Sequence, residues 1–322
     1  MALHRPDRIE WLTAAGGRLR IDAATAEVLE CFERRGVRGL LLKGASIARW
    51  LYVDATDRPY ADCDVLVAPT DFDAGEEALK SLGYVKPFDD RRMPSWWREH
   101  ANEWHRPSDG LCVDLHRTLV GVGVDDATVW RALSADTEDV MVAGCPVAAL
   151  SLPARAMHVA LHATQHGVRW PLGVADLERA LNAGDDDLWR QAAVLAAELQ
   201  ATEAFVAGLR LAPAGKDLIV RLALPDVSSV DAELRAGSPP PLALGFEQLA
   251  RAPGMRARVE IAWRKFVPPP AFMRHWDPRA ANGPMALARA YLRRPLWLLR
   301  RAPTGLRAWY RARRSVRAAG SR

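Results

Sequence analysis

The sequence predicts an α/β (α+β) chain in which a mixed sheet with flanking helices is followed by an α-helical domain. Three observations lead to this prediction. Short apolar runs typical of buried strands alternate with amphipathic helical segments up to about residue 145. Ala/Leu-rich segments with helical spacing continue to about residue 250, and a proline-rich segment, expected to be irregular over 266–284, and an arginine-rich tail follow. We therefore expect three parts, residues 1–145, 146–250 and 251–322.

The first part is expected to run helix, strand, helix, strand, helix and hairpin. The first helix ends at Gly36, and the third has acidic residues in its first turn and ends at Gly83, which are good start and stop signals. The expected helices cover residues 22–36, 45–53 and 69–83, and the expected strands cover 37–42 and 62–67, with a further short strand at 84–88.

The hairpin is predicted from two extended runs around the turn Ser108-Asp109-Gly110. The second run alternates, so successive side chains point to opposite faces of the strand. One face carries Leu111, Val113 and Leu115, and the other carries Cys112, Asp114 and His116.

Composition and charge narrow the class of protein. A hydrophobic content of 49% and a charged content of 26% are ordinary for a globular protein and exclude extensive disorder. We find no signal-sequence pattern and no apolar run approaching the roughly 18 residues of a membrane span, so a cytoplasmic protein is expected. The scattered cysteines predict small buried thiols rather than disulfides or a zinc site: Cys31, Cys63, Cys112 and Cys145.

The carboxylates in "RPYADCDVLV" need an explanation. Asp62 and Asp64 are two positions apart at the start of an apolar strand, so both leave the same face, where they repel each other and burial penalises both. One interpretation is a strand end whose acids point into water. The other is a divalent cation between them, joined by Asp114 from a neighbouring strand, because Mg²⁺ prefers oxygen ligands.

The motifs "LLKGASIARWLY", "DRPYADCDVLV" and "VDLHRTL" resemble the uncharacterised nucleotidyltransferase family of the DNA polymerase β-like superfamily. The similarity continues more weakly through residues 154–181 and 266–276. It implies a five-stranded mixed sheet, Mg²⁺-dependent nucleotidyl transfer in residues 1–145 and a helical domain behind it. Transfer would move an NMP from an NTP to an unknown hydroxyl-type acceptor and release pyrophosphate.

The resemblance implies a role for each matching residue. Asp62 and Asp64 would hold two Mg²⁺ ions that bind the triphosphate. Asp114 would hold the catalytic metal and help to deprotonate the acceptor, and His116 would support it.

Phosphate contacts are implied for four other residues. Gly44 and Ser46 would lie at a helix N-terminus, where backbone N–H groups meet a phosphate. Lys43 and Arg58 would balance triphosphate charge, although solvated cations at strand ends are the plainer interpretation. The superfamily has Gly-Ser at this turn, whereas this chain has Gly44-Ala45-Ser46.

Several other residues have two interpretations. His158, His162 and His166 recur at the spacing of one helix face, which suits a transition metal or the lining of an interface or nucleotide cleft. Asp176 would face that stripe or cap its own helix. Three tryptophans near the hairpin would stack on a base or pack in the core: Trp96, Trp97 and Trp104.

The tail is strongly basic. Residues 289–322 hold eleven arginines and no acid, so in a chain of net charge +5 the first 288 residues carry −6. This tail could bind an anionic membrane surface or nucleic acid, or form a solvated end that Pro295, Pro303 and Gly305 divide into short pieces. Two alternatives to an enzyme follow: a non-catalytic nucleotide-binding or assembly module of the same fold, and an adaptor that acts through its tail.

Overall fold

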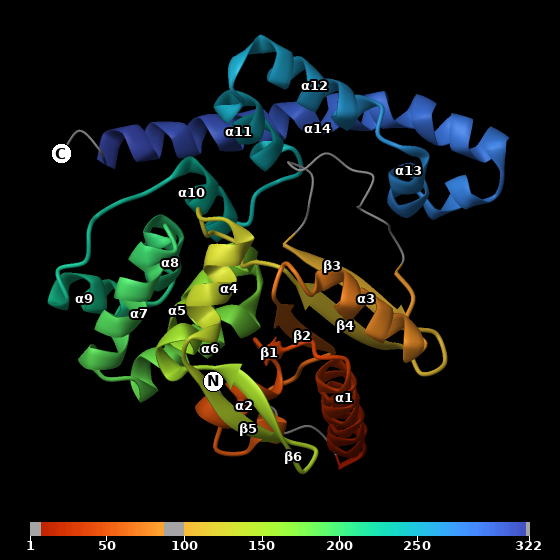
Figure 1. Ribbon diagram of the computed structural model, residues 1–322. Helices are drawn as coiled ribbons and strands as arrows, with labels where there is room; N and C mark the ends of the chain where they lie inside the picture. Colours follow the sequence, from red (N-terminus) through yellow and green to blue (C-terminus); the bar gives the residue numbers. More distant parts are fainter. Residues whose placement is uncertain (1–7, 87–99, 320–322) are drawn as a thin grey trace.

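A mixed six-stranded sheet forms the centre of the molecule (Figure 1). The computed structural model describes residues 8–86 and 100–319. The strands lie in the order β3-β4-β2-β1-β6-β5, one more strand than the resemblance implied. Their bounds are β1 (Gly39–Leu41), β2 (Asp62–Val67), β3 (Ala101–Arg106), β4 (Leu111–His116), β5 (Thr137–Val142) and β6 (Cys145–Leu150).

Strand β2 lies between two different neighbours. It pairs parallel with β4 and antiparallel with β1, and β1 pairs parallel with β6. The hairpins β3–β4 and β5–β6 supply the two outer strands. The predicted alternation of β4 is confirmed, because Val113 and Leu115 are buried in the core on one face while Asp114 lies on the other.

Helices cover both faces of the sheet. One face packs against α1 and α3 in a core that includes Phe32, Val65 and Leu79. The other packs against the helical region through Leu40, Leu66 and residues of α5. The helices are α1 (Arg8–Arg34), α2 (Ala45–Leu51), α3 (Phe72–Ser81), α4 (Asp126–Ser134), α5 (Leu152–His166), α6 (Pro171–Ala183), α7 (Asp186–Glu198), α8 (Thr202–Leu209), α9 (Pro213–Arg221), α10 (Val230–Ala236), α11 (Ala243–Arg251), α12 (Gly254–Phe266), α13 (Pro270–Trp276) and α14 (Pro284–Ala319).

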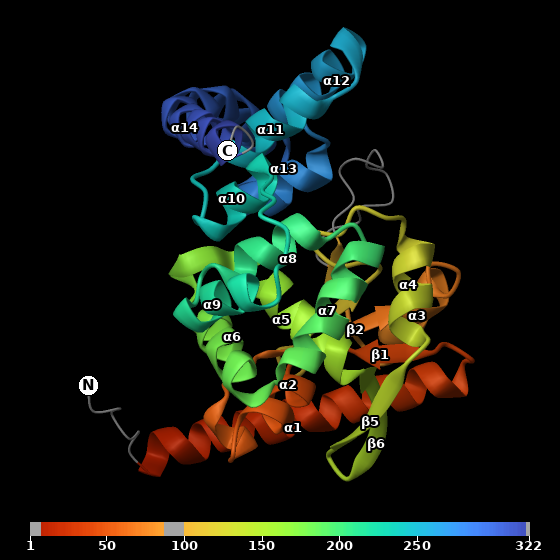
Figure 2. The ribbon, with the colours of Figure 1, turned by 90° about the vertical axis from the view of Figure 1, so that its left-hand side faces the viewer.

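The C-terminal helices lie apart from the sheet. Figure 2 shows α11 to α14 on the far side of α10 from the sheet. Helix α14 packs against α10, α11, α13 and the short 3₁₀ helix η5 (Pro278–Ala281). Within the described residues, no helix is both long and apolar enough to cross a membrane.

The structure corrects three sequence predictions. Residues 145–150 form β6, so the helical region that follows the sheet begins at α5 rather than near residue 146. The stretch 266–284, predicted to be irregular, contains α13 and η5. Pro295 and Pro303 do not break the tail into pieces, because α14 continues for 36 residues through both. A proline in a helix interior costs about 3 kcal/mol, and packing along one side of α14 offsets this cost.

The cysteines are free thiols, as predicted, but only two are fully buried. Cys31 of α1 and Cys63 of β2 lie in the core between this helix and the sheet. Cys112 is partly exposed and Cys145 is exposed at the start of β6, so the expectation of burial is wrong for these two.

Candidate active site

Two carboxylates face each other across neighbouring strands. In the parallel pair β2–β4, Asp64 is the register partner of Asp114, so both side chains leave the same face of the sheet at the same level. Asp62 lies on that face two residues earlier. This face also contacts the helical region, because Leu66 belongs to the core shared with α5.

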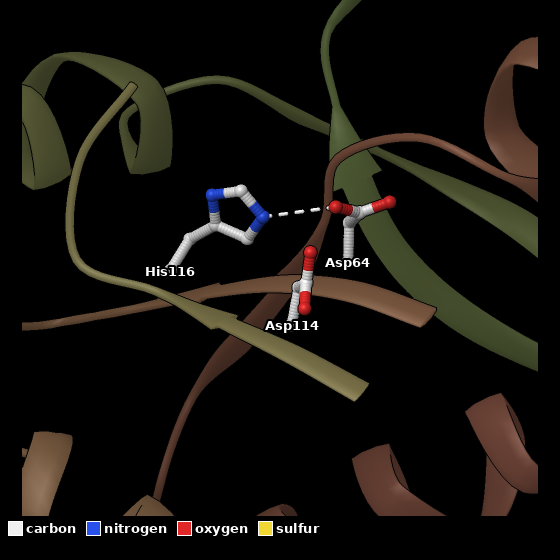
Figure 3. Close-up of side chains that lie close together, drawn as sticks. All are labelled: Asp64, Asp114 and His116. Atoms are coloured by element: carbon white, nitrogen blue, oxygen red, sulfur yellow. Dashed lines mark hydrogen bonds and ion pairs between the residues drawn. The ribbon is translucent and has the colours of Figure 1, made fainter. Parts of the chain in front are cut away.

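Asp64 is the most deeply buried acid of this group, with 1% of its surface exposed. Its Oδ1 accepts an ion-pair contact from Lys43 Nζ at 2.8 Å. His116 Nε2 lies 2.9 Å from the same oxygen (Figure 3). Lys43 lies two residues after the end of β1, so three neighbouring strands of the sheet bring these groups together.

Two neighbours, Lys43 and His116, determine the charge state of Asp64. Burial alone would raise the pKa of this carboxyl, but the Lys43 ammonium and the His116 hydrogen bond outweigh burial and hold the pKa well below its usual range. Burial likewise opposes the charge of Lys43, and the carboxylates of Asp64, Asp62 and Asp114 overcome it, so the pKa of Lys43 is raised. Asp64 and Lys43 are therefore both ionised.

The remaining two acids are only partly compensated. Burial, and then the charge of Asp64, raises the pKa of Asp114 to about 6 and also raises the pKa of Asp62. The protein therefore places too little positive charge beside β2 and β4 to compensate these two carboxylates. A divalent cation would meet it.

The donor atoms are close enough to share an ion. One ligand atom each from Asp64, Asp114 and His116 lie within 4.8 Å of one another (Figure 3). Asp62 lies outside this close group, although its position on the same face makes it the next oxygen donor along β2. The two carboxylates suit a hard cation such as Mg²⁺, whereas an imidazole is a less typical ligand for it.

The turn after β1 is tight, and the hydroxyl of Ser46 beyond it is buried. Gly44 precedes α2 with φ 59° and ψ −115°, a conformation that favours glycine. Ser46 is fully buried, and its hydroxyl donates to the backbone oxygens of Leu42 and Lys43. The predicted phosphate contact at this turn therefore involves backbone N–H groups in preference to the Ser46 side chain, and it stays a prediction.

Arg58 is engaged elsewhere. Its guanidinium forms a buried ion pair with Asp176 of α6, with Nη2 2.8 Å from Oδ2 and Nε 3.0 Å from the same oxygen. Tyr52 donates its hydroxyl to the other oxygen of Asp176 at 2.8 Å. Asp176 lies inside α6 and so does not cap it, and its contacts with Arg58 and Tyr52 tie α6 to the segment between α2 and β2. Phosphate binding by Arg58 stays a prediction, and this pairing opposes it.

Buried histidines surround the acidic group on the α5 side. Burial, and then the charge of Lys43, lowers the pKa of His158 to about 3. His100 lies with its ring centroid 5.4 Å from that of His116, and burial lowers its pKa to about 3. Among the described residues, no three ligand atoms of the α5 stripe come together as a metal cluster, so the lining interpretation fits better.

The sequence did not single out His100. It lies before β3, and only the pairing of β3 with β4 brings it beside His116. The prediction of base stacking can be checked for only one of the three tryptophans. Trp104 is 1% exposed within the core, which excludes base stacking, and Trp96 and Trp97 lie outside the described residues.

Comparisons with known proteins identify one family. Residues 8–214 match the model of a family described as uncharacterised nucleotidyltransferases. The chain also resembles a solved structure of the antibiotic-resistance factor ANT(2'')-Ia, with 14% identity and a TM-score of 0.41 over 56% of this chain and 94% of that one. A nucleotidyltransferase-like protein from Paracoccidioides brasiliensis shares 12% identity, with a TM-score of 0.32 over 57% and 92% of the two chains. Both scores are too low to assign a function, and no curated protein matches.

Proposed function

This chain belongs to the uncharacterised nucleotidyltransferase family, and on that premise we propose that it transfers a nucleoside monophosphate from an NTP to a hydroxyl-type acceptor. The acceptor oxygen forms a bond to the α-phosphorus, the bond from that phosphorus to the bridging oxygen breaks, and pyrophosphate leaves. The reaction depends on Mg²⁺, with two ions in the full site.

One observation carries the proposal: Asp64 and Asp114 are register partners on parallel strands, with Asp62 on the same face. These three residues would hold the metal. When bound, Mg²⁺ neutralises triphosphate charge and polarises the phosphoryl group. The raised pKa values of Asp62 and Asp114 support this assignment, because the fold leaves both carboxylates without enough positive charge nearby.

The other residues have roles that follow from their positions. Asp114 is more exposed than Asp64, so it is better placed to accept the proton of an acceptor hydroxyl. His116 fixes the orientation of Asp64 through its 2.9 Å contact. Lys43 is 17% exposed at its side chain and lies where its ammonium can also reach an oxygen of a bound triphosphate.

A second candidate is a nucleotide-binding module of the same fold without catalysis. The observation in its favour is that Lys43 and His116 both contact Oδ1 of Asp64, so this carboxylate has its charge balanced by protein groups alone. Such a module would bind an NTP and release it unchanged.

The test is label transfer from α-labelled NTPs in the presence of Mg²⁺ and a cell extract as the source of acceptor. We expect a labelled product together with pyrophosphate. Asp64→Asn and Asp114→Asn should each lower the rate by roughly 100-fold or more, since even residues behind a metal ligand typically contribute 10–100-fold.

The matched control is Asp217→Asn, which removes an exposed carboxylate from α9 and should leave the rate unchanged. Circular dichroism establishes that each variant is folded. Transfer that persists in both Asp64→Asn and Asp114→Asn would exclude the assigned site. NTP binding without pyrophosphate release, in an extract where a known nucleotidyltransferase is active, would favour the non-catalytic module.

A further inference from the structure

Helix α14 uses only one side to pack against the rest of the chain. Ala290, Leu298 and Gly305 are buried on this side. Arg294 is buried with them, and its guanidinium lies 4.9 Å from the ring of Phe272 and donates to the Lys265 backbone. This packing fixes the rotation of α14, and so it determines which residues are left on the opposite side.

The opposite side carries an apolar stripe. Its members are separated by four, three, four, three and four residues, the spacing that keeps side chains on one line of a helix. Five of them are large and 46–79% exposed. The apolar stripe consists of Leu292, Leu296, Leu299, Pro303, Leu306 and Tyr310.

Helix α12 extends this apolar surface. An apolar groove of about 700 Å³ lies between α12 and α14, lined by Trp263 and Phe266 from one helix and Pro295 from the other. Phe266 also lines a second apolar pocket with Leu299 of the stripe. Since Trp263 is 63% exposed and Phe266 42%, groove and stripe form one uncovered apolar surface.

Arginines border the stripe along its length. With 3.6 residues per turn, they lie on the flank directly beside it, and all are exposed. They are Arg289, Arg293, Arg300, Arg307 and Arg311. Arg293 pairs with Asp277 of the preceding segment at 3.1 Å, but helix α14 itself contains no acidic residue, so this face combines apolar side chains with an excess of positive charge.

We propose that this face of α12 and α14 docks on a membrane surface rich in anionic phospholipids. Leucines and aromatic rings would enter the boundary between headgroups and acyl chains, while the flanking arginines contact lipid phosphates. The helix would lie on the membrane rather than cross it, because no described helix meets the requirements for a span. This proposal does not depend on the proposed function.

The chemistry of the face argues against other partners. A second copy of α14 would bring arginines against arginines, with no acid in the helix to pair with them. A nucleic-acid backbone would satisfy the arginines and leave the exposed leucines in water. An anionic bilayer is the partner that matches both components.

The experiment is co-sedimentation of the full chain with vesicles of phosphatidylcholine, with or without phosphatidylglycerol. We expect binding to the anionic vesicles that weakens with salt. Arg289→Gln/Arg300→Gln/Arg307→Gln should weaken it on the order of 100-fold, at roughly fivefold for each arginine. Leu292→Gln/Leu299→Gln should weaken it roughly tenfold or more, since it removes the apolar contact and keeps the charge.

Two controls match these variants. Arg35→Gln/Arg131→Gln/Lys216→Gln removes the same charge from exposed positions on α4, α9 and the segment after α1. Val194→Gln/Val220→Gln removes exposed apolar side chains from α7 and α9. Both should bind vesicles like the parent chain.

Several results would overturn the proposal. Equal loss of binding in the control variants would show that net charge alone acts. Equal binding to neutral vesicles would remove the role of anionic lipid. Binding to duplex or single-stranded oligonucleotides without binding to anionic vesicles would assign the face to nucleic acid, and a stable dimer that Leu292→Gln/Leu299→Gln dissociates, without vesicle binding, would assign it to a second copy.

Discussion

The candidate active site and the outer face of α14 arrange charge in opposite ways. Beside β2 and β4, Asp64 is 1% exposed and is balanced by Lys43 and His116 at 2.8 and 2.9 Å. On α14, the arginines are exposed, and Leu292 beside them is 79% exposed. In the first region the charge of Asp64 is buried and compensated, and in the second the arginine charge is solvated while apolar groups are uncovered.

This difference indicates where single substitutions should change stability. Burial makes each charge at the active site depend on its partner, because an unpaired charge away from water is costly. Exposed groups on α14 contribute little to the free energy of unfolding, so their effect should appear only in binding. The following predictions test this contrast in decreasing order of expected effect.

The largest effect is expected at the Arg58–Asp176 pair. Asp176→Ala should lower the free energy of unfolding by about 3–5 kcal/mol, because it leaves the buried Arg58 guanidinium without its carboxylate. Urea unfolding of the parent chain and the variant, monitored by circular dichroism, measures this loss of free energy.

The matched comparison is the exposed pair of Asp186 and Arg221, whose side chains are 37% and 55% exposed. Asp186→Ala should cost less than about 1 kcal/mol. Equal losses in the two variants would show that burial of an ion pair does not determine how much free energy of unfolding is lost with its carboxylate.

The next effect concerns acid stability. An unfolded histidine takes up a proton near pH 6.5, whereas burial lowers the pKa of folded His158 to about 3. The neutral ring therefore contributes stability above pH 6.5 that is lost as the pH falls toward 3, amounting to about 3 kcal/mol by pH 4.

His158→Gln should accordingly flatten the fall in unfolding free energy between pH 6.5 and 4. The measurement is urea unfolding at several pH values in buffers containing a metal chelator. His275→Gln, at an exposed position in α13, should keep the parent slope. Parallel slopes for His158→Gln and the parent chain would rule out this contribution.

The smallest effects come from two adjacent leucines of α14. Leu298 is 6% exposed and Leu299 is 64% exposed. Leu298→Ala should lower the free energy of unfolding by about 2 kcal/mol, and Leu299→Ala by no more than about 0.5 kcal/mol. Similar losses at both positions would mean that another part of the chain covers the stripe.

The active-site strands could be predicted because their signals are local. The apolar run of Asp62–Val67 forms β2 as expected, and the Asp-Gly turn correctly predicts the hairpin of β3 and β4. Alternation along β4 gives the face of Asp114. The family resemblance then implied that Asp114 joins Asp62 and Asp64, whereas the parallel pairing of β4 with β2 is visible only in the structure.

Other features depend on contacts between distant residues. Arg58 and Asp176 are 118 positions apart, so no local pattern joins them. The strands β5 and β6 have partly exposed faces and an alanine-rich end, which resembles the helical segments that follow. The length of α14 was underestimated because local proline penalties were counted without the packing that offsets them.

The parallel pairing of β1 with β6 has a practical consequence for dissecting this protein. A fragment that ends at residue 145 lacks β6. The backbone of β1, the strand that precedes Lys43, then becomes an open edge of the sheet. The same cut also discards the carboxylate that neutralises Arg58. Such a fragment is expected to aggregate rather than behave as a minimal enzyme.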